Sequence, residues 1–512
     1  MISEQVIKNR GRWIFLIGAA ALASIILVAL HFRSSATTPP SPPKLLTTVP
    51  ASASESENDP VDLNGAHIRT DRRVYPEPPL PGPLRAGDKF IDPVFGTQIM
   101  RATDDKECPP PGCGTFYSQW PTFNADNTRL LIRKGASGEV LIKEFDPVNF
   151  VLGQTLRRSP TLQGRVALTW EGATWSGTDP DLIFLHVNYY DASYPATGMK
   201  LYSYRPSSNQ FRLIKDFGPQ LAPGKPDYLF EMHIAQNGKD DIFTFLHKRV
   251  GLSEPIKIIV WKRSTDTVLQ HLAINDSHLP PQGANAALPD KSGRWIFFPS
   301  NGVPVASEMR VAVLDLSNNT WQGIYWTGAD DSVSHADLGT GTLVGHGQFS
   351  GAATIRSLSD VHRVVRLFDY KDTKGVTDWS NDQHTSMYAD DESWAMMSLY
   401  DESDVFETGA FENEVMQFST SNPNKFRRLF HHRSQIDNLT PTTGYWALPK
   451  ATITHDGRYI AFTSNWEKSG RYDLYIARIE PPATEPGSAQ RITAPTSGNT
   501  STRPRRTKSP SK

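Results

Sequence analysis

The stretch that decides the fold is Lys450-Ala-Thr-Ile-Thr-His-Asp-Gly-Arg-Tyr-Ile-Ala-Phe-Thr-Ser-Asn465, followed by Arg471-Tyr-Asp-Leu-Tyr-Ile-Ala-Arg478. It contains two alternating apolar runs, residues 459–462 and 474–476, and each run follows Gly, Asp or Asn turn residues. This pattern predicts a meander of short antiparallel strands. One meander cannot bury all of its apolar faces, so we expect similar units to recur along the chain and to stack on one another.

Similar apolar strand cores do recur, roughly 50 to 65 residues apart. They lie at residues 129–132, 181–184, 241–245, 294–298, 342–344, 393–397 and 459–462. The spacing suits a propeller built from four-stranded blades, and about seven units would close a ring. The sequence therefore predicts an all-β, about seven-bladed β-propeller.

Several short segments resemble known propeller families. Residues 456–465 with 473–475 resemble the Asp-Gly repeat of TolB-type, WD40-like propellers. Residues 92–104, 117–131 and 175–183 resemble segments of the oligogalacturonate lyase propeller family. The resemblance implies a propeller over about residues 89–479. For the lyase family it also implies a funnel with His and Gln metal ligands, which here would be Gln383, His384 and His335.

The two ends of the chain differ from its centre. Residues 1–12 are basic and residues 13–32 are apolar without a charge, which is long enough to cross a bilayer, so we expect one transmembrane helix with a cytoplasmic N-terminus. A cleaved signal peptide is the alternative. Both place the rest of the protein outside the cytoplasm, in the periplasm or at the cell surface. Residues 33–86 are rich in Pro and Ser, which predicts a tether. We expect residues 87–480 to form the propeller and residues 481–512 to form a disordered basic tail.

Composition excludes some partners and constrains others. The formal net charge is −1, so we expect no nucleic-acid partner. The only cysteines, Cys108 and Cys113, predict a small disulfide loop in an oxidising compartment. Residues 96–103 are expected to close the ring by pairing with the blade at 450–479, since such pairing removes two exposed strand edges. Residues 490–493 are the rival closing strand.

Candidate functional residues come from one position in each blade, the start of the innermost strand, because these starts converge on a central funnel. Aligning the blades on Lys450 gives Trp120, Glu171, His233, Asn285, His335, His384 and Lys450. Three of these are histidines, which with Gln383 could bind one divalent ion such as Mn²⁺, Zn²⁺ or Ca²⁺. The alternative is that the histidines only form hydrogen bonds between blades.

Two functions fit these residues. The first is a membrane-anchored module that binds a polysaccharide fragment or a protein partner at its funnel, without catalysis. The second is a metal-assisted polysaccharide lyase, in which Lys450 acts as base or as carboxylate partner because burial among aromatic rings lowers its pKa. Trp120, Tyr228, Tyr445 and Trp446 are candidates for stacking on sugar rings. The chain has no Gly-x-Ser-x-Gly elbow and no phosphate-binding Gly-rich loop.

Overall fold

The computed structural model describes residues 68–82, 84–135, 137–236, 238–302, 305–377, 381–401 and 409–482. The expected cytoplasmic segment, membrane anchor, most of the tether, the rival closing strand and nearly all of the basic tail lie outside these residues. Among the residues described, none forms a helix long and apolar enough to cross a membrane.

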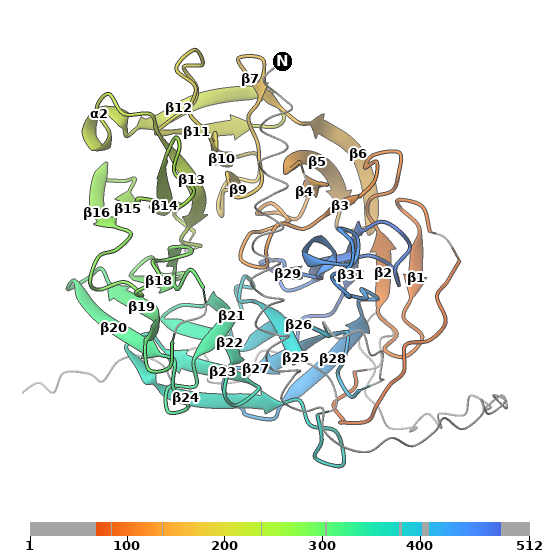
Figure 1. Ribbon diagram of the computed structural model, residues 1–512. Coiled ribbons are helices and arrows are strands. Elements are labelled where there is room, and N and C mark those ends of the chain that lie inside the picture. The colour runs from red at the N-terminus through yellow and green to blue at the C-terminus, as the bar shows by residue number, and fades with distance from the viewer. Residues whose placement is uncertain are drawn as a thin grey trace, which may run out of the picture. The chain divides into compact units, whose positions relative to one another are not determined.

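Seven antiparallel sheets form a ring, which confirms the predicted seven-bladed propeller (Figure 1). In chain order, the strands of blade 1 are β3 (Cys113–Gly114), β4 (Arg129–Lys134), β5 (Glu139–Asp146) and β6 (Val151–Arg158), and those of blade 2 are β9 (Ala173–Trp175), β10 (Ile183–His186), β11 (Lys200–Arg205) and β12 (Gln210–Asp216). Blade 3 has β13 (Asp227–Ile234), β14 (Ile242–Arg249), β15 (Lys257–Lys262) and β16 (Thr267–Ala273), and blade 4 has β17 (Leu288–Pro289), β18 (Trp295–Pro299), β19 (Met309–Asp315) and β20 (Thr320–Tyr325).

The last three blades complete the ring. Blade 5 has β21 (Val333–Leu338), β22 (Thr342–Gly347), β23 (Ala352–Ser357) and β24 (Asp360–Asp369), and blade 6 has β25 (Asn381–Ser386), β26 (Trp394–Asp401), β27 (Glu414–Ser419) and β28 (Phe426–His431). Blade 7 has β29 (Thr452–Ile453), β30 (Tyr459–Ser464), β31 (Asp473–Arg478), β2 (Gln98–Arg101) and β1 (Lys89–Ile91). Minor elements are the hairpin β7 (Thr161–Leu162) and β8 (Arg165–Val166), the short helix α2 (Gly218–Leu221) and the 3₁₀ turn η1 (Tyr445–Ala447).

The seven apolar runs recognised in the sequence are the second strands of the seven blades. These strands carry the most continuous apolar sequence because neighbouring blades cover both of their faces. All eight residues of β26 and all six of β30 are buried, for example. The apolar clusters lie between blades, as where Met396 and Val415 of blade 6 pack with Ile460 and Phe462 of blade 7. Each blade therefore depends on its neighbours for burial.

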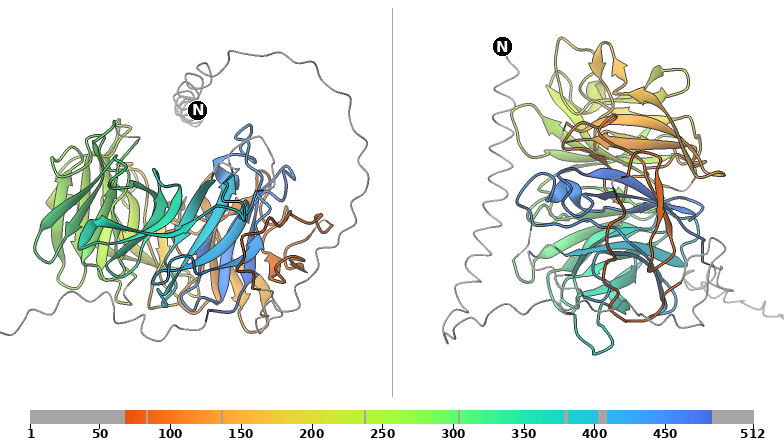
Figure 2. Two further views of the ribbon diagram at one scale, coloured as in Figure 1. Left: turned by 90° about the horizontal axis from the view of Figure 1, so that it is seen from below. Right: turned by 90° about the vertical axis from the view of Figure 1, so that its right-hand side faces the viewer.

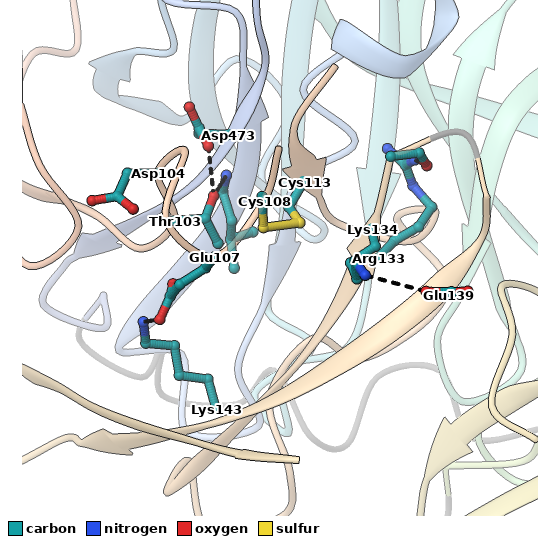
Figure 3. Close-up of a disulfide and its surroundings, with 12 residues drawn as sticks. Thr103, Asp104, Glu107, Cys108, Cys113, Arg133, Lys134, Glu139, Lys143 and Asp473 are labelled. Carbon is teal, nitrogen blue, oxygen red and sulfur yellow. Dashed lines mark hydrogen bonds and ion pairs between the residues drawn. A yellow bond between two sulfur atoms is a disulfide. The ribbon is translucent and has the colours of Figure 1, made fainter. Parts of the chain in front are cut away.

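The ring closes as the sequence predicts. Strand β2 pairs antiparallel with β31, with Gln98 opposite Arg478 and Arg101 opposite Tyr475. Cys108, in the loop between β2 and β3, forms the expected disulfide with Cys113 of β3 (Figure 3). Thr103 donates its hydroxyl to Asp473 at 2.8 Å beside it. The first and last strands of the propeller are thus held together at several points.

Residues 68–82, called the strap here, pack on the folded unit, although the sequence assigned residues up to 86 to the tether. Arg72 donates to the carbonyl of Asp369 at 2.8 Å and lies over the ring of Phe368 at 4.3 Å. Arg428 of blade 6 donates to the carbonyl of Arg73 at 2.6 Å. Figure 2 shows this segment crossing the C-terminal blades. The packed chain therefore begins before the expected boundary at residue 87, because Arg and aromatic side chains hold the strap in place.

Candidate funnel site

A cavity of about 310 Å³ is lined by residues of the inner strands β13, β17 and β21, of β18 and β19 in blade 4, and of several loops. Aromatic rings and polar groups from blades 1 to 5 and 7 line it. The polar and aromatic lining residues are Tyr117, Gln119, Trp120, Trp170, Glu171, Glu231, His233, Asn285, Ser300, Arg310, Ser334, His335 and Tyr445. This size and mixture are typical of small-ligand pockets.

Four charged or ionisable residues at the funnel share an uncommon backbone conformation. The φ angles are +64° at Glu171, +44° at Glu231, +44° at His335 and +40° at Lys450. A non-glycine residue in this region costs on the order of 1 kcal/mol or more, and such residues cluster at functional sites. The four belong to blades 2, 3, 5 and 7, so the feature recurs around the ring.

Strand bulges produce two of these conformations. The pairing register shifts between Phe230 and Met232 in β13, and between Ser334 and Asp337 in β21. A bulge places an extra residue in the strand and redirects its side chain. In blade 3 the left-handed residue is Glu231, two positions before the histidine that the sequence alignment selected. Glu231 was missed as a candidate because a bulge cannot be located from strand periodicity alone.

Glu171 and Glu231 lie on adjoining parts of the funnel wall. The carbonyl of Glu171 accepts a hydrogen bond from the N–H of Met232 at 3.0 Å. Glu231 Oε1 lies 3.0 Å from His233 Nε2, and the His233 ring packs on Trp120 with ring centroids 4.2 Å apart. Burial raises the pKa of both carboxyls to about 8, and the charge of Glu231 contributes to the rise at Glu171. Burial also lowers the pKa of His233 to about 3.

Lys450 lies behind the cavity wall. It is 3% exposed, and its Nζ donates to the carbonyl of Tyr445 at 2.6 Å while facing the Tyr445 ring. Burial, together with the nearby Arg133, holds the pKa of Lys450 well below its usual value. The direction agrees with the sequence-based expectation. The ammonium is nevertheless enclosed by the protein's own aromatic groups, and Lys450 does not line the cavity.

His335 and His384 come together, but Gln383 does not join them. His335 Nδ1 lies 2.8 Å from Asp382 Oδ1, and the His335 and His384 rings stack with centroids 4.7 Å apart and planes 23° apart. Nearly parallel rings direct their in-plane nitrogen lone pairs side by side rather than toward one point. Gln383 alternates with Asp382 and His384 along β25, so it points to the opposite face, where it accepts the hydroxyl of Tyr370.

These positions do not fit a shared metal ion. Over the described ranges, no group of three or more His, Cys, Asp or Glu side chains converges as a metal site would require. Within the described residues, His384 Nδ1 is buried and has no hydrogen-bond partner.

The predicted residues divide into two groups. Trp120, Glu171, His233, Asn285 and His335 line the cavity, whereas Trp446, Gln383, His384 and Lys450 do not. Trp446 instead packs edge-on against Trp170 at 5.1 Å and beneath the Arg133 guanidinium at 4.2 Å.

Aligning the blades with one another also missed two lining residues besides Glu231. Trp170 immediately precedes the aligned position of blade 2. Arg310 lies on the third strand of blade 4, whereas the alignment selected only the starts of the innermost strands. Trp170 Nε1 and Arg310 Nε are buried and have no hydrogen-bond partner among the described residues. Burial also lowers the pKa of Arg310.

The ring of blades defines the chain as a seven-bladed β-propeller, and residues of several blades line one cavity. Solved structures share this fold, among them two oligogalacturonate lyases. An oligogalacturonate lyase in complex with manganese is 15% identical with a TM-score of 0.53, covering 78% of this chain and 99% of that chain. Oligogalacturonate lyase from Vibrio parahaemolyticus is 14% identical with a TM-score of 0.52, covering 78% of this chain and 100% of that one.

A weaker structural similarity links the chain to TolB from Acinetobacter baumannii, which aligns at 12% identity over 69% of this chain and 79% of that chain, with a TM-score of 0.32. No protein-family model matches the sequence, and none of the characterised proteins compared with it matches. At these identities the similarity establishes the fold alone.

Proposed function

We propose that the funnel binds an oligosaccharide. The observation that carries this proposal is that Trp170 and Arg310 line the cavity and that one buried N–H of each, Trp170 Nε1 and Arg310 Nε, has no acceptor in the described protein. Buried polar groups are normally paired, so an external acceptor is expected there. Sugar hydroxyl and ring oxygens are acceptors, and the apolar faces of sugar rings pack on rings such as Trp120 and Tyr445.

A small ligand fits the cavity better than a protein partner. A volume of about 310 Å³ lies within the range of small-molecule sites. A stable protein interface instead needs on the order of 1,000 Å² or more of buried surface. We therefore propose a polysaccharide fragment, and not a protein partner, as the ligand of the funnel. Binding of a protein partner instead is one outcome of the binding test.

We place the propeller outside the cytoplasm, tethered by the apolar segment at residues 13–32. The support is the Cys108–Cys113 disulfide, because structural disulfides form and persist in oxidising compartments. Protease protection of tagged cells tests the topology. Digestion of the propeller in intact spheroplasts is expected, and full protection would contradict the placement.

Calorimetric titration of the full chain with neutral and acidic tetrasaccharides tests the funnel. Trp170→Phe keeps the ring but removes the unpaired N–H, so we expect affinity to fall about fivefold or more, as for loss of one hydrogen bond. Trp321→Phe, in the outer strand of blade 4, is the matched control. Absence of binding by every sugar, or equal affinities of the two variants, would contradict the proposal.

A metal-assisted lyase is the second function. Its support is the buried, unpartnered His384 Nδ1 beside His335, and its difficulty is the lack of converging donors. Elemental mass spectrometry of protein purified without metal resin decides between the two. We expect chelation to leave sugar affinity unchanged. One Mn²⁺ or Zn²⁺ per chain, lost in both His335→Ala and His384→Ala, would instead favour the lyase.

A further inference from the structure

Two aromatic side chains lie beside the funnel cavity, where blades 4 and 5 meet (Figure 1). Trp326 follows β20, the last strand of blade 4, and Phe349 lies in the turn between β22 and β23 of blade 5. Their ring centroids are 5.2 Å apart, and the ring planes are inclined by 59°. Phe349 is 48% exposed, and Trp326 is partly buried. Trp326 and Phe349 are together called the ledge here.

The ledge adjoins the wall of the cavity at two points. The guanidinium of Arg310, a residue that lines the cavity, lies 6.0 Å from the centre of the Trp326 ring. Gln348, the residue before Phe349, donates its side-chain amide to the hydroxyl of Ser334, which also lines the cavity. A molecule that fills the cavity and extends past Arg310 and Ser334 therefore meets the ledge next.

Hydrogen bonds fix the backbone under both rings. The carboxylate of Asp331 accepts the main-chain N–H of Phe349 at 3.0 Å and that of Ser350 at 2.8 Å. The N–H of Trp326 donates to the carbonyl of Glu308 at 2.8 Å. An aromatic ring on a fixed backbone has little conformational freedom to lose when a ligand binds. The ledge is therefore preorganised for a ligand.

The exposed aromatic rings in the described part of the chain gather at this side of the propeller. They are Tyr325, Phe349 and Tyr445. Tyr445 lines the cavity, Phe349 belongs to the ledge, and Tyr325 directly precedes Trp326. An exposed ring forgoes the stabilisation that burial would give it. Adjoining exposed apolar side chains, unlike single scattered ones, mark interaction sites such as ligand-binding grooves.

We propose that the ledge is a second sugar-binding subsite, on which an oligosaccharide longer than the cavity stacks the apolar face of one of its rings. The proposal rests on the proposed function, because the first sugar units occupy the cavity. The cavity volume of about 310 Å³ is at the lower end of the range for small-ligand sites, about 300 to 1,000 Å³, so a tetrasaccharide extends beyond it. The electron-rich faces of aromatic rings attract the C–H groups of a sugar ring. The funnel accordingly prefers chains of several sugars.

Calorimetric titration of the full chain with di-, tetra- and hexasaccharides, from one neutral and one acidic series, tests the ledge. We expect the unaltered protein to bind the hexasaccharide at least about fivefold more tightly than the disaccharide, as one added aromatic contact would give. Phe349→Ala should remove this gain and leave the affinity for the disaccharide within about twofold, because the disaccharide stays in the cavity. Phe349→Tyr keeps the ring and should retain the gain.

Two further variants separate the ledge from its surroundings. Leu213→Ala is the matched control, because Leu213 is also 48% exposed but lies on β12, the outer strand of blade 2. It should leave the affinity for every chain length unchanged. Trp170→Phe removes a donor inside the cavity, so it should weaken the binding of all chain lengths by a similar factor. Phe349→Ala should act on the longer chains alone.

Each other result has a distinct meaning. Equal affinities of the unaltered protein for all chain lengths would overturn the ledge and leave the proposed binding in the cavity intact. The same conclusion follows if Phe349→Ala leaves the gain unchanged or weakens every chain length equally. Absence of binding by every sugar would overturn the proposed function and the ledge together. Thermal unfolding of the variants excludes misfolding as the cause of a lost affinity.

Discussion

Cys113 donates its main-chain N–H to the carbonyl of Tyr472 at 3.0 Å, which joins the first strand of blade 1 to the last blade. The N–H of Tyr472 donates in turn to the carbonyl of Pro111 at 3.0 Å, so the disulfide loop is bonded to the chain before β31 from both directions. Arg471 adds a hydrogen bond to the carbonyl of Cys108 at 2.9 Å. The loop therefore belongs to the closure of the ring, alongside the pairing of β2 with β31.

Removing the disulfide should weaken this closure. The double variant Cys108→Ser, Cys113→Ser loses a short covalent loop, which by chain entropy corresponds to about 2 kcal/mol of unfolding free energy. Urea unfolding of oxidised, reduced and variant protein measures the change. Reduction of the unaltered protein should lower the midpoint as the variant does, and reduction of the variant should have no effect. Equal midpoints for all samples would show that the disulfide does not contribute.

Gly112 should tolerate no side chain. Its φ is +121°, and a Cβ added there would lie 1.8 Å from the carbonyl oxygen of Tyr472. Gly112→Ala must therefore displace the backbone that forms the closure, and we expect a loss of about 3 kcal/mol or more. Gly470→Ala is the matched control, because φ is +87° there but the space is open. It should cost only about 1 kcal/mol. Similar losses for both variants would contradict the steric argument.

The strap should contribute to stability through Arg72 rather than Arg73. Arg72 bonds Asp369 at 2.9 Å and covers Phe368, whereas Arg73 makes one exposed pair with Asp71 at 3.2 Å. Arg72→Ala should lower the unfolding free energy by about 1–2 kcal/mol, and Arg73→Ala by less than about 0.5 kcal/mol. Thermal unfolding of the two variants is the measurement. A strap that adds nothing would give equal melting temperatures.

Stability should fall as pH rises, through Glu171 and Glu231. Their pKa is about 8 in the folded protein against 4.5 for an ordinary glutamate, so between these values the folded state binds more protons than the unfolded state. The favourable contribution is complete below pH 4.5 and is lost as pH passes through about 8. Glu171→Gln should reduce this decline by at least about 1 kcal/mol at pH 8. Urea titrations at pH 5, 6.5 and 8 test it, and parallel declines in both proteins would contradict it.

Much of the funnel could be found from strand periodicity. Aligning the blades on their second strands selected Glu171, His335 and Lys450, which all have a left-handed backbone, and of these Glu171 and His335 line the cavity. The same alignment chose His233 instead of Glu231, because the bulge in β13 adds a residue that a strict two-residue period does not record. Arg310 reaches the cavity from a third strand, and no local pattern marks such a residue.

By itself the sequence determined the number of blades, the strand cores, the closing strand and the disulfide, because each depends on local alternation or on short spacing in the chain. Only the tertiary structure decided which candidates meet. Stacking of His335 on His384 turns their lone pairs away from a common point, and the strand alternation of β25 sends Gln383 to the opposite face. The hydrogen bond from the N–H of Met232 to the carbonyl of Glu171 brings the backbone at Glu231 next to that of Glu171 across a blade boundary. Such relationships arise from how neighbouring sheets pack, and packing across blades is not encoded in the periodicity of any one of them.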